Sequence, residues 1–158
     1  MTDPKPARTD ADLGRTLADF SVPSEPGNER LAMETVAEAV KVLDISGENL
    51  ERLKTAVAEA TMNAMEHGNK YKAEVPVEIQ VLVTDRDLIV RITDRGSGPP
   101  PPEHGVDPDL EAKLEGMQTP RGWGLFLIKS MVDEMNVTGD EGHHTVELVV
   151  HLGSEGGK

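Results

Sequence analysis

Glu59 and Asn63 are spaced so that their side chains share one face of a predicted helix, in the segment AVAEATMNAMEHGN. Positions i and i+4 of an α-helix lie one turn apart on the same side. The amide oxygen of Asn63 is a ligand type that Mg²⁺ accepts, and the carboxylate of Glu59 can orient or deprotonate a nucleophile beside a metal-bound phosphate. The alternative is an ordinary solvated polar face that also includes Glu66. Asparagine is a poor helix former, however, and gains nothing on such a face.

A second motif, DRGSG at residues 94–98, follows the apolar run LIVRIT. An aspartate before two glycines at a strand end often forms only a tight turn, because glycine supplies positive φ and aspartate caps its own backbone. The functional alternative is that Asp94 accepts a hydrogen bond from an adenine amino group. Gly96 and Gly98 would then let the base approach the backbone. The motif alone leaves both interpretations open.

The third motif places Gly122 and Gly124 at the start of an amphipathic segment, RGWGLFLIKS. Exposed N–H groups and the helix dipole at such a start form a binding site for phosphate. A plain joint between a loop and a helix explains two glycines equally well. Neither the P-loop nor the dinucleotide-binding fingerprint occurs in the sequence, so phosphate binding of those two kinds is excluded.

Three helices are predicted to carry or support these motifs. The first lies in SEPGNERLAMETVAEAVKVLDI, with Ser24 as N-cap. The second runs from about residue 48 to 67 and ends at Gly68, a residue suited to the left-handed position after a helix. The third runs from about residue 124 to 135. Apolar residues at helical spacing indicate the buried faces of the first and third helices; they are Leu31, Val36, Ala39, Val40 and Leu43, then Leu125, Ile128, Val132 and Met135.

Strands are predicted before, between and after the helices. Ala18, Phe20 and Val22 alternate with polar residues, and the segments 75–83 and 88–93 form a hairpin around the turn at residues 85–87. The segment MNVTGDEGHHTVELVVHLG predicts a second hairpin, and the proline-rich residues 99–120 predict a long loop. This order favours an α+β fold, a two-layer sandwich of a mixed, mainly antiparallel sheet with helices on one face.

Length and composition restrict the class of protein. At 158 residues, the chain has room for one domain, predicted at residues 13–153 between flexible tails at 1–12 and 154–158. The formal charge of −13 argues against direct binding of nucleic acid or of anionic membranes. Without cysteine there is no disulfide and no thiolate metal site. No secretory signal or apolar run long enough to span a bilayer occurs, which favours the cytoplasm.

The three motifs together, in this order, are far more specific than each alone. The chain resembles the GHKL ATPase superfamily, which includes gyrase, histidine kinases and mismatch-repair ATPases. Within it, the sequence is similar to the bacterial anti-sigma-factor serine/threonine kinases. AVAEATMNAMEHGN corresponds to the N box, ITDRGSG to the first glycine box and RGWGLFLIKSMVDEM to the second. The resemblance covers residues 18–152 and implies the Bergerat-type ATP-binding fold.

Carried over by position, the resemblance implies a role for each motif. Glu59 would be the general base, Asn63 the Mg²⁺ ligand and Asp94 the contact to the adenine amino group. The glycines would line the base pocket and meet the phosphates; they are Gly96 and Gly98, then Gly122 and Gly124. The implied cofactors are ATP and Mg²⁺.

The implied function is an anti-sigma factor that is also an ATP-dependent serine/threonine kinase. Its substrate would be an anti-sigma-factor antagonist of the STAS type, and it would regulate a sigma factor by partner switching. The family's habit favours a homodimer. Two alternatives remain open: a non-catalytic ATP-binding module that only exchanges partners, and a detached histidine-kinase ATPase domain.

The sequence departs from the family pattern at two places. The lid between the glycine boxes is rich in proline, so contacts from Thr119 or Arg121 are not assigned. The last box often has Gly-Thr before the final strand, whereas Gly142 is followed here by His143, His144 and Thr145. Thr145 therefore receives no role. Adjacent residues of a strand point to opposite faces, so the two histidines are not expected to bind a metal together.

Overall fold

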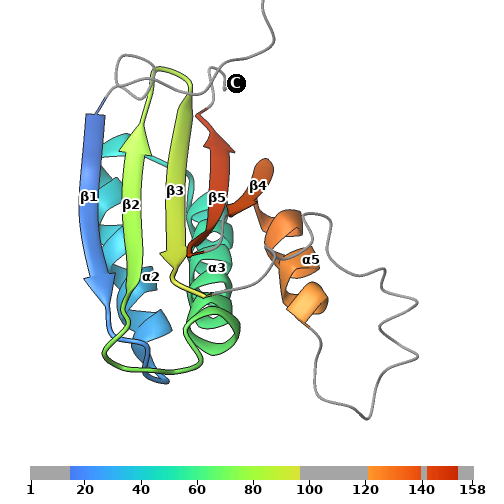
Figure 1. The fold of residues 1–158 in the computed structure, drawn as a ribbon. Coiled ribbons are helices and arrows are strands. Elements are labelled where there is room, and N and C mark those ends of the chain that lie inside the picture. Colours follow the sequence, from blue (N-terminus) through green and yellow to red (C-terminus); the bar gives the residue numbers. More distant parts are fainter. Residues whose placement is uncertain (1–14, 97–120, 140–141, 153–158) are drawn as a thin grey trace, which may run out of the picture.

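The computed structural model describes residues 15–96, 121–139 and 142–152, with the backbone alone for residues 121–124. Five strands form one sheet in the order β1-β2-β3-β5-β4, and each strand pairs antiparallel with its neighbours (Figure 1). The strands are β1 (Arg15–Val22), β2 (Val77–Val83), β3 (Asp87–Asp94), β4 (Glu134–Gly139) and β5 (His144–His151). The helical segments are α2 (Asn28–Ala39), η1 (Val40–Leu43), α3 (Gly47–Asn63), the π turn η2 (Ala64–Gly68) and α5 (Arg121–Met131).

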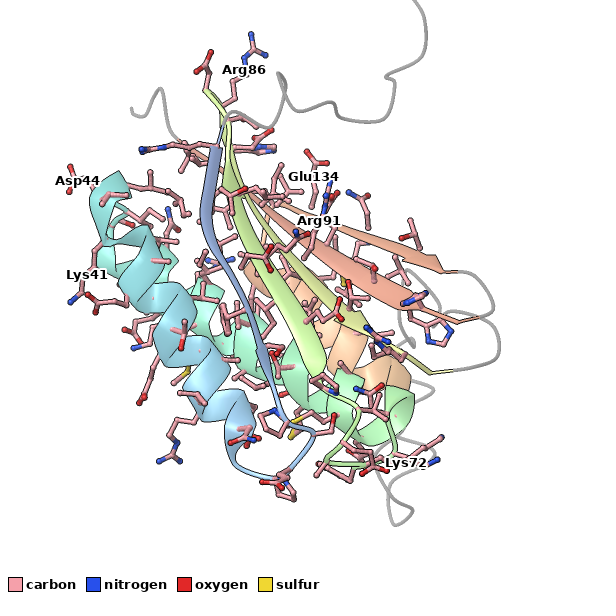
Figure 2. All side chains as sticks on the ribbon, turned by 60° about the vertical axis from the view of Figure 1, so that its left-hand side comes forward. Lys41, Asp44, Lys72, Arg86, Arg91 and Glu134 are labelled. Atoms are coloured by element: carbon pink, nitrogen blue, oxygen red, sulfur yellow. The ribbon has the colours of Figure 1, made fainter. Side chains whose placement is uncertain are left out.

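The helices cover one face of this sheet. Alternate residues of the central strands, such as Ile79 in β2 and Val90 in β3, are fully buried against apolar residues of the helices, such as Val57 in α3. α3 contacts both α2 and α5. In Figure 2, Lys41 lies on the helical side and Arg91 on the other side of the sheet. The predicted two-layer α+β sandwich is confirmed, and every strand pairing among the described residues is antiparallel.

The second predicted helix is confirmed, with a widened last turn, but Gly68 does not take the left-handed conformation proposed for it and is the last residue of the π turn. Ser46 caps its start, because its hydroxyl oxygen accepts from the N–H of Asn49 at 3.2 Å. The α-helix ends at Asn63 and continues as a π turn, in which the N–H of Asn69 donates to the carbonyl of Ala64 at 2.8 Å. Lys70 and Tyr71 then adopt positive φ, at 55° and 54°. The chain therefore turns sharply directly after the motif that contains Glu59 and Asn63.

The start of the first helix was predicted wrongly. The N-cap of α2 is Gly27, at a φ of 99°, and no side chain caps this helix. Ser24 lies before it and is fully buried, with its hydroxyl donating to the carbonyl of Val75 at 2.6 Å. Leu31 was predicted to be in the core, yet it is 50% exposed, because Ala32 and Val36 occupy the inner face of α2.

The third helix was predicted three to four residues too late. It spans Arg121–Met131, and Met135 lies in β4 instead. The helix ends where the ladder with β5 begins: the N–H of Asp133 donates to the carbonyl of Val149 at 3.0 Å. Met135 is still buried in the main core, now as a strand residue. The predicted loop at 99–120 and both predicted tails lie outside the described residues.

Both hairpins are confirmed. The first has its turn between Val83 and Asp87, and the second joins β4 to β5. Among the helices that the structure describes, none is long and apolar enough to cross a membrane.

Candidate functional site

Asp94 ends β3 and is buried, with 4% of its surface exposed. One carboxylate oxygen, Oδ1, accepts the N–H of Gly96 at 2.8 Å and lies 3.1 Å from Nδ1 of His144. A buried carboxylate without such donors would be strongly unfavourable. The geometry therefore holds this acceptor at a fixed place at the end of the sheet.

Gly68 and Gly96 lie directly beside the carboxylate of Asp94. A Cβ atom added to Gly68 would lie 2.2 Å from Cγ of Asp94, and one added to Gly96 would lie 2.7 Å from the carbonyl oxygen of Gly68. A side chain at either position would therefore force these neighbours to shift. The first glycine box and the end of the N-box segment thus meet directly around Asp94. Gly98, the other predicted pocket glycine, lies outside the described residues.

The side chain of Asn69 connects the segments around Asp94 by hydrogen bonds. Asn69 is 3% exposed, and its side-chain oxygen accepts the N–H of Arg95 at 2.8 Å. Its amide nitrogen donates to the hydroxyl of Ser24 and to the carbonyl of Val75, each at 3.0 Å, and to the carbonyl of Pro76 at 3.2 Å. One side chain therefore joins the segment before α2, the turn after η2, the start of β2 and the end of β3. Asn69 ends the N-box segment, and no role was predicted for it from the sequence.

Glu59 and Asn63 lie one turn apart on α3, as predicted. Burial raises the pKa of the Glu59 carboxyl above its ordinary value, and the negative charges of Glu29 and Glu66 raise it further. Asn63 is 7% exposed, and its amide nitrogen has no hydrogen-bond partner. Buried polar atoms are nearly always paired in proteins. An unpaired amide beside a carboxyl with a raised pKa is typical of a site that awaits a ligand.

The first turn of α5 contains Gly122 and Gly124, so both predicted glycines stand at a helix start. In Figure 1, this turn, the carboxyl end of α3 and the end of β3 all lie toward the lower end of the molecule. α5 packs against α3, and β3 contacts η2. The fold therefore brings the three sequence motifs to the same end of the helical layer, although they are separated along the chain.

His144 is the site residue that the motifs missed. It is 2% exposed and stands directly opposite Asp94 in the ladder between β3 and β5. The two histidines were predicted to face opposite sides of a strand. β5 begins at His144, and His143, just before it, is exposed. The neighbouring Thr145 instead approaches Thr93, with 2.9 Å between their hydroxyl oxygens. Within the described ranges, no three His, Asp or Glu side chains are placed to hold a metal ion.

The sequence from residue 22 to 150 matches the family of histidine kinase-like ATPase domains. The chain belongs to this family. The predicted resemblance to the GHKL ATPases is therefore confirmed, and ATP is the nucleotide that such a domain binds.

Curated relatives of this ATPase domain are similar over most of its length. The anti-sigma F factor of Anoxybacillus flavithermus (strain DSM 21510 / WK1) is 34% identical over 127 residues, which are 79% of this chain and 85% of that protein. The anti-sigma F factor of Bacillus subtilis (strain 168) is 31% identical over 135 residues, or 85% of this chain and 90% of that protein.

Two solved structures share the fold of the ATPase domain. One contains the RsbU and RsbW domains of a Mycobacterium tuberculosis protein, with a TM-score of 0.61, 16% identity and 85% of this chain covered. The match spans 32% of that longer chain. The other is the SiaB–SiaC complex of Pseudomonas aeruginosa, with a TM-score of 0.58 and 12% identity over 86% of this chain and 90% of that one. At these identities, the likeness shows the fold alone.

Proposed function

We propose that this protein is an anti-sigma factor and an ATP-dependent serine/threonine kinase whose substrate is an anti-sigma-factor antagonist of the STAS type. The observation that carries the proposal is the pair on α3: Glu59, with its raised pKa, one turn before the buried and unpaired amide of Asn63. A module that only binds partners needs no general base. The similarity to anti-sigma F factors supports the same conclusion.

Each site residue has one task in this proposal. The carboxylate of Asp94 accepts the adenine amino group, and the helix start at Gly122 and Gly124 receives the phosphates. The side-chain oxygen of Asn63 would hold Mg²⁺, because this cation prefers oxygen ligands. The unpaired atom of this side chain, Nδ2, is a hydrogen-bond donor and not a ligand for the cation. When bound, Mg²⁺ neutralises charge on the phosphates.

The transfer itself then proceeds at Glu59. Its carboxylate takes the proton of a serine or threonine hydroxyl on the antagonist. The hydroxyl oxygen forms a bond to the γ-phosphorus while the bond from that phosphorus to the β–γ bridging oxygen breaks, and ADP leaves. A raised pKa suits this task, because a general base works best when its pKa approaches the operating pH.

Charge explains how such a kinase switches partners. Phosphorylation adds close to two negative charges to the antagonist, and the kinase itself has a formal charge of −13. Repulsion weakens the complex with the phosphorylated antagonist. The unphosphorylated antagonist, in contrast, occupies the kinase and releases the sigma factor. In this proposal, the protein acts in the cytoplasm as a homodimer, which analytical ultracentrifugation tests.

The experiment compares Glu59→Gln with Glu48→Gln, a change at an exposed position in the first turn of the same helix. Transfer from γ-labelled ATP to a purified antagonist should fall roughly 10²–10⁴-fold in Glu59→Gln and stay unchanged in the control. ATP affinity should be retained in both. Equal rates in the two variants would exclude Glu59 as the base. An acid-labile product would indicate phosphohistidine and thus a histidine-kinase domain, and absence of transfer by the unaltered protein would indicate a binding module.

A further inference from the structure

His144 and Asp94 form a buried pair across two strands. They stand opposite each other in the register of β3 and β5, and their side chains are 2% and 5% exposed. Nδ1 of His144 lies 3.1 Å from Oδ1 of Asp94. An ionised carboxylate can only accept hydrogen bonds, so the hydrogen of this bond belongs to Nδ1. The histidine therefore donates to the residue that is proposed to read the adenine base.

The two oxygens of Asp94 are used differently. Oδ1 receives two N–H donors, from Gly96 at 2.8 Å and from His144. Oδ2 has no hydrogen-bond partner among the residues that the structure describes, and the backbone of Gly68 lies against the same carboxyl group. Two donors on one oxygen and a close backbone behind the group fix its rotation. The second oxygen is thereby left as the acceptor for a ligand.

We propose that His144 is a positioning residue for nucleotide specificity: it orients Asp94 so that Oδ2 accepts the exocyclic amino group of adenine. This inference rests on the proposed ATP site and adds the residue that sets its preference for the base. Adenine presents an amino donor at position 6, whereas guanine presents an oxygen acceptor there. A carboxylate held in one orientation accepts the first and repels the second. Because the carboxylate of Asp94 is already held in one orientation, it loses little conformational entropy when the base binds.

The neighbouring residues support an assignment to His144 alone. His143 is exposed, and Thr145 pairs with the hydroxyl of Thr93 on the other face of the sheet. Of the three residues after Gly142, only His144 faces Asp94. A role in reading the base therefore predicts an effect at position 144 and none at position 143.

The experiment measures the Kd of two nucleotides by isothermal titration, ATP and purine riboside 5′-triphosphate, which lacks the 6-amino group. The unaltered protein should prefer ATP. His144→Leu removes the donor and should weaken ATP binding about tenfold, with the Kd of the analogue unchanged. His144→Asn places an amide donor near the position of Nδ1 and should restore the preference. His143→Leu is the matched control and should change neither Kd. If His144→Leu does not fold, His144→Met replaces it, because Met also lacks an N–H donor in its side chain.

The outcomes separate this inference from the ATP site itself. Equal weakening of both nucleotides in the position-144 variant, or an unchanged preference, would overturn the role of His144 while the ATP site stands. Asp94→Asn tests the site independently and should abolish the preference. If the unaltered protein binds neither nucleotide, both the ATP site and this inference are overturned.

Discussion

The ladder between β3 and β5 has an aspartate–histidine pair at each end, and the two pairs differ mainly in exposure. Asp94 and His144 are 3.1 Å apart with side chains 5% and 2% exposed. Asp87 and His151 are 2.9 Å apart, but their side chains are 17% and 54% exposed. In Figure 2, Arg86, the neighbour of Asp87, lies at one end of the sheet. Lys72, which follows Gly68 along the chain, lies at the opposite end. The same two residue types therefore occupy very different surroundings.

This difference explains why one pair is suited to recognition and the other is not. Water screens the exposed pair, so its contribution to stability is small. The buried pair has lost its hydration, so each polar atom must find a partner, and an oxygen without one binds an incoming donor strongly. Burial, more than residue type, decides which pair can discriminate between ligands.

The largest expected effect is that of Asp94→Asn on ATP binding. The amide oxygen would keep the place of Oδ1, which Gly96 and His144 hold. The amide nitrogen would then replace Oδ2, so a donor would face the adenine amino group where the charged acceptor was. Hydrogen bonds to charged groups contribute about 1.5–3 kcal/mol, so we expect the Kd for ATP to rise about 100-fold in a titration. Asp87→Asn, the matched change in the exposed pair, should leave the Kd unaltered. Similar effects of both changes would remove the distinction between the two ends.

A smaller effect is expected when the space around the buried pair is filled. In Gly68→Ala, the new Cβ would lie 2.2 Å from Cγ of Asp94, so the carboxyl group or the backbone must move. Overpacking of this kind costs about 2 kcal/mol, measured as the free energy of unfolding in urea. Gly47→Ala is the control, because its Cβ would meet nothing within 4 Å. Equal stability of the two variants would show that Asp94 is not confined as described.

These residues also show how far the sequence could predict the molecule. The spacing of Glu59 and Asn63 predicted a shared helix face, because helical periodicity is a local property. His143 and His144 differ in exposure, but β5 starts at His144, so strand alternation does not apply to this pair. Periodicity also could not predict that His144 meets Asp94, since the two are 50 residues apart and only the register of β3 and β5 aligns them.

Tertiary contacts also explain the predictions that were wrong. Ser24 has a typical N-cap side chain, but its hydroxyl bonds to Val75 instead. Met135 continues the apolar spacing of α5, yet strand pairing with β5 begins one residue earlier, at Glu134. Asn69 ends the N-box segment, but no role was predicted for it, although its side chain bonds to four different residues. Each of these outcomes depends on contacts with residues outside the local segment. Local propensity and periodicity carry no information on such contacts.

The next largest loss of stability is expected from a change in the turn that contains Asn69, beside the buried pair. Asn69→Ala leaves the N–H of Arg95, the neighbour of Asp94, without its acceptor and removes three donor contacts. A loss of about 1–2 kcal/mol in unfolding free energy follows from the unpaired buried groups, together with weaker ATP binding. The control is Asn49→Ala, at an exposed position in the first turn of α3, which should be neutral. Unchanged ATP affinity in Asn69→Ala would separate the turn from the site.

The smallest effect is expected at the exposed pair, and it should depend on pH. A hydrogen bond to Asp87 raises the pKa of His151 above its ordinary value of 6.5, burial partly opposes this, and the charges of Asp133, Asp87 and Glu134 raise it further. Because the folded pKa exceeds the unfolded one, the stabilisation is fully present below about pH 6.5 and is lost as the pH rises through the folded pKa. The difference in unfolding free energy between the unaltered protein and His151→Gln should therefore be larger at about pH 5.5 than at about pH 8.5. Solvent screening at a half-exposed side chain keeps this difference in unfolding free energy below about 1 kcal/mol.

His143→Gln serves as the control for a general effect of removing a histidine. A difference that is the same at both pH values would mean that the ion pairs of His151 contribute nothing to stability. A difference well above about 1 kcal/mol would mean that the exposed pair escapes solvent screening, and the contrast with the buried pair would be lost.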